Sequence, residues 1–134
     1  MNTVEPHLGN LLTVTAAIEV GAGIMMLALP SLAATLLLGS PLDSAAGSTV
    51  ARVAGVALIA LGVACWRARS PGKSGAAKGL VGAMVIYNAG VAAVLVYASL
   101  GLKLSAFGLW PAVLLHAVMT VWCVMCLLNG PAQI

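Results

Sequence analysis

Four long apolar stretches constrain this chain most strongly. An apolar run of about 18 or more residues with few charges predicts a transmembrane helix, because backbone polar groups in a bilayer must be paired within the helix itself. Runs of this kind cover residues 8–29, 49–66, 78–100 and 109–128. Of all residues, 62% are hydrophobic and 7% are charged, too few charges to cover a water-facing surface. We therefore predict an all-α membrane protein, a single membrane domain over residues 1–134 with four transmembrane helices.

The segments between the runs predict how the helices are arranged. Residues 40–48 and 70–75 are rich in Ser, Pro and Gly, which is typical of loops, and residues 101–108 form a third short connection. Short connections make consecutive helices antiparallel, so we expect an up-down-up-down bundle. Residues 31–39 are apolar but too short to cross a bilayer, and we expect this segment to lie in the outer interface.

The placement of charge predicts an orientation. Basic residues gather in the loop 67–78, and cytoplasmic loops of membrane proteins carry such an excess of Lys and Arg. We expect this loop and both chain termini to be cytoplasmic, with Asp43 and Lys103 facing outward. An alternative role for the basic loop is contact with anionic lipid headgroups. The four basic residues concerned are Arg67, Arg69, Lys73 and Lys78.

Glu19 is a carboxylate in the middle of an otherwise uncharged apolar run. An ionisable group at that depth is costly, so it either pairs within the bundle or has a function. A rise of about 1.5 Å per residue places Asn88 near the same depth and His116 within about a turn of it. We predict a buried polar cluster of these side chains. It is either a proton relay or small-ligand site, or a hydrogen-bonded contact that fixes helix register.

Arg52 is a further candidate member of this cluster. It lies near the outer end of the second apolar run. Its long side chain can extend toward the headgroups, the default for an arginine near a helix end, or reach down toward Glu19. The sequence leaves both alternatives open.

The fourth apolar run carries a stripe of metal-ligand types. Members of this stripe are spaced i, i+3, i+7 and i+10, which places them on one helix face, and imidazole, thioether and thiolate groups suit Cu(I). Cys and Met are also ordinary fillers of apolar interiors, and four ligands along one straight helix cannot converge on one ion. We predict no metal site and reduced cysteines, with the stripe as the alternative: His116, Met119, Cys123 and Cys126.

Small residues recur at four-residue spacing along the apolar runs. Pairs of this kind let helix backbones approach closely in lipid. Because the chain is rich in Ala and Gly, the spacing also arises by chance, so the pairs are weak markers of helix contacts. They are Ala17/Gly21, Ala51/Gly55, Gly79/Ala83 and Ala89/Ala93.

Several motifs in the first half of the chain resemble a known group of proteins. In chain order they are Glu19-x-x-x-Gly23, Pro30, Arg52-x-x-Gly55, Leu61-Gly62 and Trp66. The arrangement resembles the small four-helix bacterial membrane proteins grouped as DoxX-like and related uncharacterised families. The resemblance implies a multi-pass protein of the bacterial inner membrane, sometimes working beside a redox enzyme. The cysteines are not part of it.

The sequence leaves three functions open. The first is a non-catalytic accessory, assembly or stabilising subunit of a larger membrane complex, since no set of catalytic groups converges. The second is a proton or small-solute carrier centred on Glu19, Asn88 and His116. The third is a quinone- or metal-associated redox protein. We predict contact with the lipid bilayer and with other subunits or further copies of the chain. No cofactor is predicted, a bound lipid or quinone being the alternative, and no nucleic-acid surface is present.

Overall fold

The structure, a computed structural model, describes residues 4–70 and 74–128. These residues form five α-helices and the loops that connect them. Four helices contain an apolar stretch long enough to cross a membrane. The prediction of an all-α protein with four candidate membrane spans is therefore confirmed. Lys73, in the predicted basic loop, lies outside the described residues. The helices are α1 (Val4–Ala28), α2 (Pro30–Leu38), α3 (Ala45–Ala68), α4 (Ser74–Leu100) and α5 (Leu109–Leu128).

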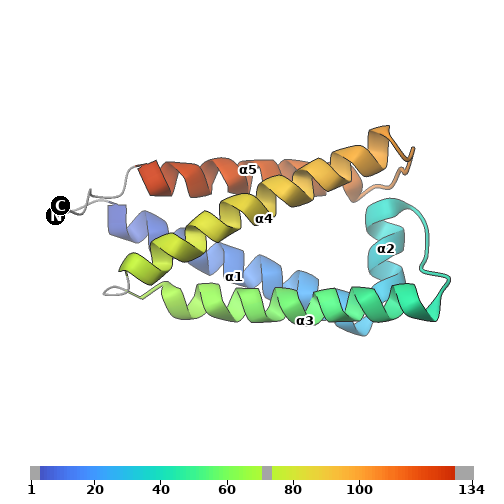
Figure 1. Cartoon of the computed structure of the whole chain (residues 1–134), viewed down its shortest axis with the longest axis horizontal. Helices are drawn as coiled ribbons and strands as arrows, with labels where there is room; N and C mark the ends of the chain where they lie inside the picture. The colour runs from blue at the N-terminus through green and yellow to red at the C-terminus, as the bar shows by residue number, and fades with distance from the viewer. Residues whose placement is uncertain (1–3, 71–73, 129–134) are drawn as a thin grey trace.

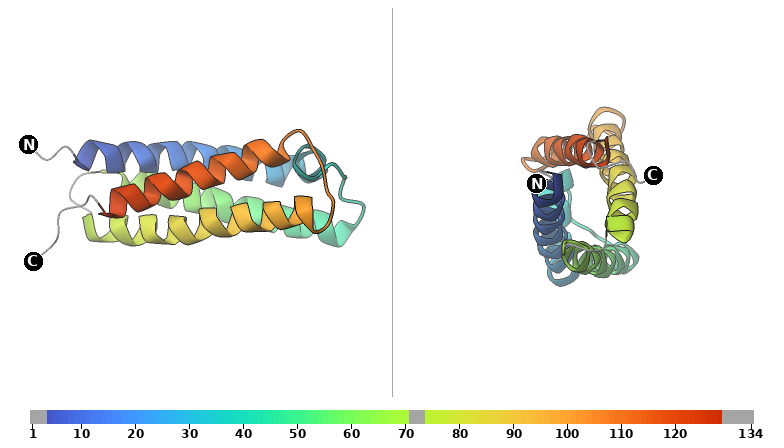
Figure 2. Two further views of the ribbon diagram at one scale, coloured as in Figure 1. Left: turned by 90° about the horizontal axis from the view of Figure 1, so that it is seen from above. Right: turned by 90° about the vertical axis from the view of Figure 1, so that its left-hand side faces the viewer.

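The four long helices run alternately up and down (Figure 1). α1 packs closely against α3, and α4 packs closely against α5, whereas the contacts between these two pairs are sparser. The end-on view in Figure 2 shows the pairs on opposite sides of the bundle. α1 begins and α5 ends at the same end of the molecule. The predicted bundle topology is confirmed, while the side of the membrane on which this end lies stays a prediction.

Three helices begin earlier than the apolar runs that predicted them. α1 begins at Val4, α3 at Ala45 and α4 at Ser74, each about one turn before the run. For α3 the start is set by Ser44, whose side-chain oxygen accepts a hydrogen bond from the backbone N–H of Gly47 at 2.9 Å. Such a cap pairs an N–H group that has no partner inside the helix. Hydropathy therefore locates the apolar part of a helix, and capping sets where the helix begins.

The short helix α2 lies across the end of the bundle, at a steep angle to the long helices (Figure 1). Pro30 occupies its first turn, where a missing N–H has no helical partner to lose. The backbone N–H of Gly108 donates to the carbonyl oxygen of Leu36 at 3.0 Å, which joins α2 to the loop between α4 and α5. At Gly39 the chain takes a left-handed φ of 79° and passes against Ser105. The apolar segment 31–39 is thus mostly helical.

α1 and α3 approach each other closely at glycines. A Cβ on Gly23 would lie 2.6 Å from the carbonyl oxygen of Gly55, and a Cβ on Gly55 would lie 2.7 Å from the carbonyl oxygen of Gly23. Gly62, about two turns further along α3, lies against Ala16 and Val20 of α1 in the same manner. No larger residue fits at these positions without moving a backbone, so the glycines set the distance between the two helices.

Most of the small-residue pairs in the sequence lie elsewhere. Gly55 belongs to one such pair and lies at the α1–α3 contact, whereas a Cβ on Gly21 or Gly79 would have no neighbour within 4 Å. Ala89 and Ala93 are exposed on α4. Four-residue spacing alone therefore did not identify which face of a helix packs inside the bundle.

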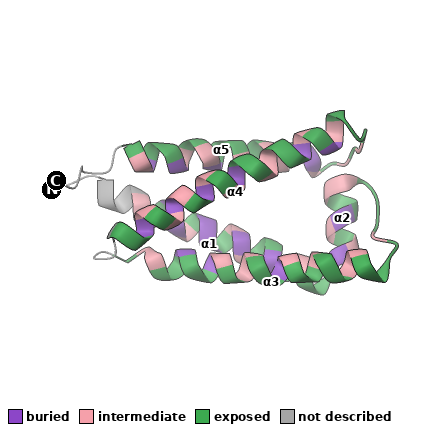
Figure 3. Ribbon diagram, in the orientation of Figure 1, coloured by how far each residue is buried: buried purple, intermediate pink, exposed green. Residues whose placement is uncertain are grey.

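The exterior and the interior of the bundle differ in burial rather than in polarity. Exposed residues cover the outward side of every long helix (Figure 3) and include large apolar side chains such as Val53, Ile86 and Leu114. A continuous apolar exterior of this kind suits the acyl chains of a bilayer. Most of the buried apolar residues form one cluster in the half of the bundle where α1 begins, around Leu11 and Val81.

Candidate functional site

Glu19 is almost completely buried on α1, with 3% of its surface exposed. Its Oε2 atom accepts a hydrogen bond from the phenolic hydroxyl of Tyr87 on α4 at 3.0 Å. This contact is a direct side-chain bond between the two helix pairs. The sequence predicted a buried partner for Glu19 but did not name Tyr87.

Asn88, the next residue on α4, pairs with α5. Its side-chain amide donates from Nδ2 to the carbonyl oxygen of Met84 at 2.9 Å, and its Oδ1 lies 2.8 Å from Nδ1 of His116. Because an amide oxygen can only accept, Nδ1 of His116 carries the proton and donates. Asn88 is 2% exposed, so this bond lies inside the bundle. The sequence placed these two side chains at similar depth, and the structure brings them together.

The rings of Tyr87 and His116 connect the two hydrogen-bonded contacts. Their centroids lie 5.8 Å apart and their planes meet at 77°, an edge-to-face arrangement that aromatic rings favour. Glu19, Tyr87, Asn88 and His116 therefore form one continuous group, called here the polar cluster. It joins α1 to α4 and α4 to α5, so side chains in contact with one another extend across three helices of the bundle.

Thr15 is a further buried polar residue near Glu19. It lies one turn earlier on the same face of α1 and is 1% exposed. Its hydroxyl oxygen has no hydrogen-bond partner among the described residues. An unpaired buried hydroxyl costs free energy, so Thr15 marks a position where a water molecule or a small protic ligand would gain a bond. The sequence did not single out this residue.

Arg52 does not join the polar cluster. Its side chain is exposed, and its Nε donates to the carbonyl oxygen of Leu27 at 3.3 Å. Leu27 is in the last turn of α1, where carbonyl groups lack a partner within the helix, and lies about 12 Å along the axis from Glu19. The Leu27 carbonyl is therefore a nearer hydrogen-bond acceptor for Arg52 than the buried carboxylate of Glu19.

The stripe on α5 lies inside the bundle, but it does not form a ligand set. Met119, Cys123 and Cys126 are buried, and they share the core with Cys65 of α3. Among the described residues, no group of three or more His, Cys, Asp or Glu side chains is arranged to hold a metal ion. All three cysteines are free thiols. The metal-ligand alternative gains no support from this arrangement.

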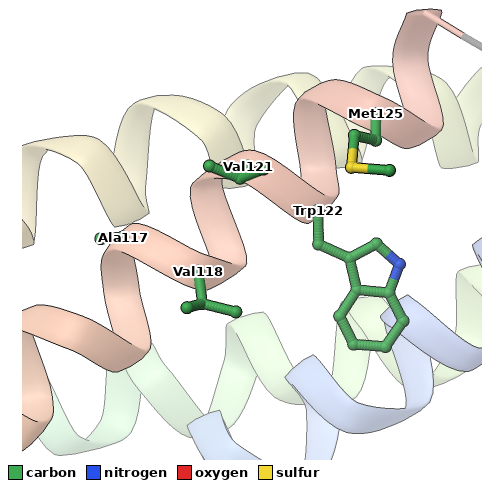
Figure 4. A pocket seen from close by; sticks show the side chains of 5 residues that line it. All are labelled: Ala117, Val118, Val121, Trp122 and Met125. Atoms are coloured by element: carbon green, nitrogen blue, oxygen red, sulfur yellow. The ribbon is translucent and has the colours of Figure 1, made fainter.

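An open apolar groove lies along α5, beside the buried stripe (Figure 4). Its volume is about 470 Å³, and the indole of Trp122 forms one wall. A purely apolar, open groove of this size suits part of a lipid acyl chain better than a polar ligand. The lining residues are Ala117, Val118, Val121, Trp122 and Met125.

Comparisons of the chain with protein-family models, with curated proteins and with solved structures give no match. The resemblance to DoxX-like proteins therefore remains a prediction from the motifs.

Proposed function

We propose that this protein is a non-catalytic accessory, assembly or stabilising subunit of a larger membrane complex. The observation that carries the proposal is the pairing of the buried side chains of Glu19 and Asn88 with groups on neighbouring helices. Tyr87 bonds Glu19, and His116 bonds Asn88. Groups that satisfy one another across helices hold those helices together, which supports a structural role over a catalytic one.

The outward face of α4 carries small residues to which a partner helix could bind. Gly79, Ala83 and Gly90 are exposed on this face, and a Cβ on either glycine would have no neighbour within 4 Å. In lipid, small residues allow another helix to come close. A bulky residue there should weaken binding to a partner subunit and leave the bundle itself intact.

Extraction of the tagged protein from its native membranes in a mild detergent tests this directly. We expect stoichiometric partner proteins, and we expect Ala83→Leu to reduce them several-fold. Ala60→Leu, which enlarges an exposed alanine on α3, is the matched control and should retain them. A monodisperse bundle without partners would contradict the proposal.

A second candidate function is transport of protons or a small solute, with Thr15 and Glu19 as the observation that favours it. A buried intramembrane carboxylate marks ion or proton pathways in many membrane proteins, and the unpaired hydroxyl of Thr15 lies one turn away on the same face. Glu19→Gln separates the two functions, because glutamine still offers an oxygen to the Tyr87 hydroxyl but cannot release a proton. A carrier would lose its flux in proteoliposomes, whereas a subunit would keep its partners.

A further inference from the structure

A small polar cleft lies at the C-terminal end of α3, away from the polar cluster. It has a volume of about 250 Å³ and is lined by Trp66, Arg67, Arg69 and Ser70. The first two of these belong to the last turn of α3, and Arg69 is its C-cap. The surrounding helix ends are those of α1 and α4 (Figure 1). The cleft therefore opens at the boundary of the apolar bundle rather than inside it.

Arg69 is held in place by Trp66. Its guanidinium carbon lies 3.2 Å from the centroid of the indole ring, a cation–π contact. The indole ring covers one side of the guanidinium carbon, and the guanidinium keeps its five N–H donors in a planar fork. The contact therefore restricts where the guanidinium lies and needs none of its N–H groups as a hydrogen-bond donor to the ring. A planar fork of this kind matches two oxygens of a phosphate group.

The other lining residues fit the same ligand. Arg67 and Ser70 are exposed, so a second guanidinium and a hydroxyl can reach an anion in the cleft. No described carboxylate lines it. The C-terminal end of the α3 dipole opposes an anion with about half a charge, less than the two positive charges of the arginines.

The position of the cleft distinguishes a lipid from a soluble phosphate. Trp66 is 51% exposed at the end of an apolar span, the depth at which tryptophan marks the headgroup region. A phosphodiester at that depth belongs to a phospholipid. An anionic headgroup complements the two guanidinium groups better than a zwitterionic one, whose own ammonium group already neutralises its phosphate.

We propose that Arg67, Arg69 and Ser70, with Arg69 positioned by Trp66, bind the phosphate of an anionic phospholipid headgroup. This site is independent of the proposed subunit function. The site would place the cleft in the leaflet that is richer in anionic lipid. In the predicted orientation this is the cytoplasmic leaflet.

The lipids that the purified protein retains test the proposal. The purified full chain is reconstituted in nanodiscs of phosphatidylcholine with added phosphatidylglycerol, re-extracted, and its retained lipids are quantified by mass spectrometry. We expect phosphatidylglycerol to be enriched over the input ratio, and we expect Arg67→Gln and Arg69→Gln each to lower the enrichment by about fivefold. Arg69→Lys should also lower it, because lysine keeps the charge but loses the planar fork.

Lys103→Gln is the matched control, since this exposed lysine belongs to the loop between α4 and α5, and that loop lies at the opposite end of the bundle. It removes one positive charge and should leave the enrichment unchanged. An equal loss in this variant would show a general charge effect and overturn the site. Displacement of the lipid by inorganic phosphate at similar concentration would overturn the assignment to a lipid. Circular dichroism of each variant confirms that the bundle is folded.

Discussion

Two of the interfaces inside this bundle are built in different ways. Between α1 and α3 the contact depends on glycines that let the backbones approach, Gly23, Gly55 and Gly62. Between the α1–α3 pair and the α4–α5 pair, a side-chain bond between Glu19 and Tyr87 crosses a sparser contact. The first interface carries an exposed hydrogen bond from Arg52 to the Leu27 carbonyl, which is long at 3.3 Å, and depends mainly on backbone proximity. The second interface has little backbone proximity to rely on.

The difference reflects what holds helices together in lipid. Apolar side chains gain little by leaving acyl chains for one another, so close packing and interhelical hydrogen bonds supply the association energy. Close packing is sensitive to added volume, because a densely packed contact cannot accept a new atom. A hydrogen bond is sensitive to the loss of one partner instead. The two interfaces should therefore respond to different substitutions.

Gly55→Ala should have the largest effect. Its new methyl group would meet the Gly23 carbonyl and the backbone of Leu27, so we expect the free energy of unfolding to fall by roughly 1–3 kcal/mol. Gly90→Ala is the matched control, because its methyl group meets nothing, and we expect no loss, with a gain of up to about 1 kcal/mol from helix propensity. Unfolding measured by denaturant titration in bilayers compares them. Equal effects would contradict the packing explanation.

Asn88→Leu should have an intermediate effect, at the contact between α4 and α5, where a side-chain hydrogen bond also joins two helices. Leucine has about the same size as asparagine, but it is apolar and offers no acceptor to the N–H group of His116. We expect the free energy of unfolding to fall by about 1 kcal/mol. Ile86→Leu, on the exposed side of the same helix, serves as the control and should be neutral. If both variants unfold alike, the bond to His116 contributes nothing.

Arg52→Gln should have the smallest effect. The side chain is exposed, and its bond to the Leu27 carbonyl is long at 3.3 Å. Exposed contacts of this type contribute little, so we expect a change below about 0.5 kcal/mol. The same unfolding titration measures it. A loss as large as that of Asn88→Leu would place Arg52 in the polar cluster after all.

Much of the fold followed from the sequence because hydropathy is a property of residues taken one at a time. The run at 109–128 reproduced α5 to the residue, since both of its ends coincide with the ends of the apolar run. The start of α3 was missed, because the Ser44 cap lies outside the apolar run. The glycine contact was missed in part, since the choice of packing face depends on how two helices cross.

The candidate site was predicted in part for a similar reason. Depth counting identified Glu19, Asn88 and His116, and the last two do meet. Tyr87 was overlooked although it directly precedes Asn88, because tyrosine is commonly read as an interfacial anchor. Thr15 could have been found from its four-residue offset from Glu19, which places both on one helix face. The direction of Arg52 depended on a free carbonyl that no sequence pattern reveals.

A double-mutant cycle between Glu19 and Tyr87 tests the central claim most directly, namely that the polar cluster fastens the two helix pairs. Glu19→Leu, Tyr87→Phe and the double variant are unfolded in bilayers beside the original chain. If the cluster fastens the pairs, we expect a coupling energy between about 0.6 and 1.7 kcal/mol, the average and the maximum found for hydrogen bonds between transmembrane helices. Strictly additive losses, with no coupling between the two substitutions, would contradict it.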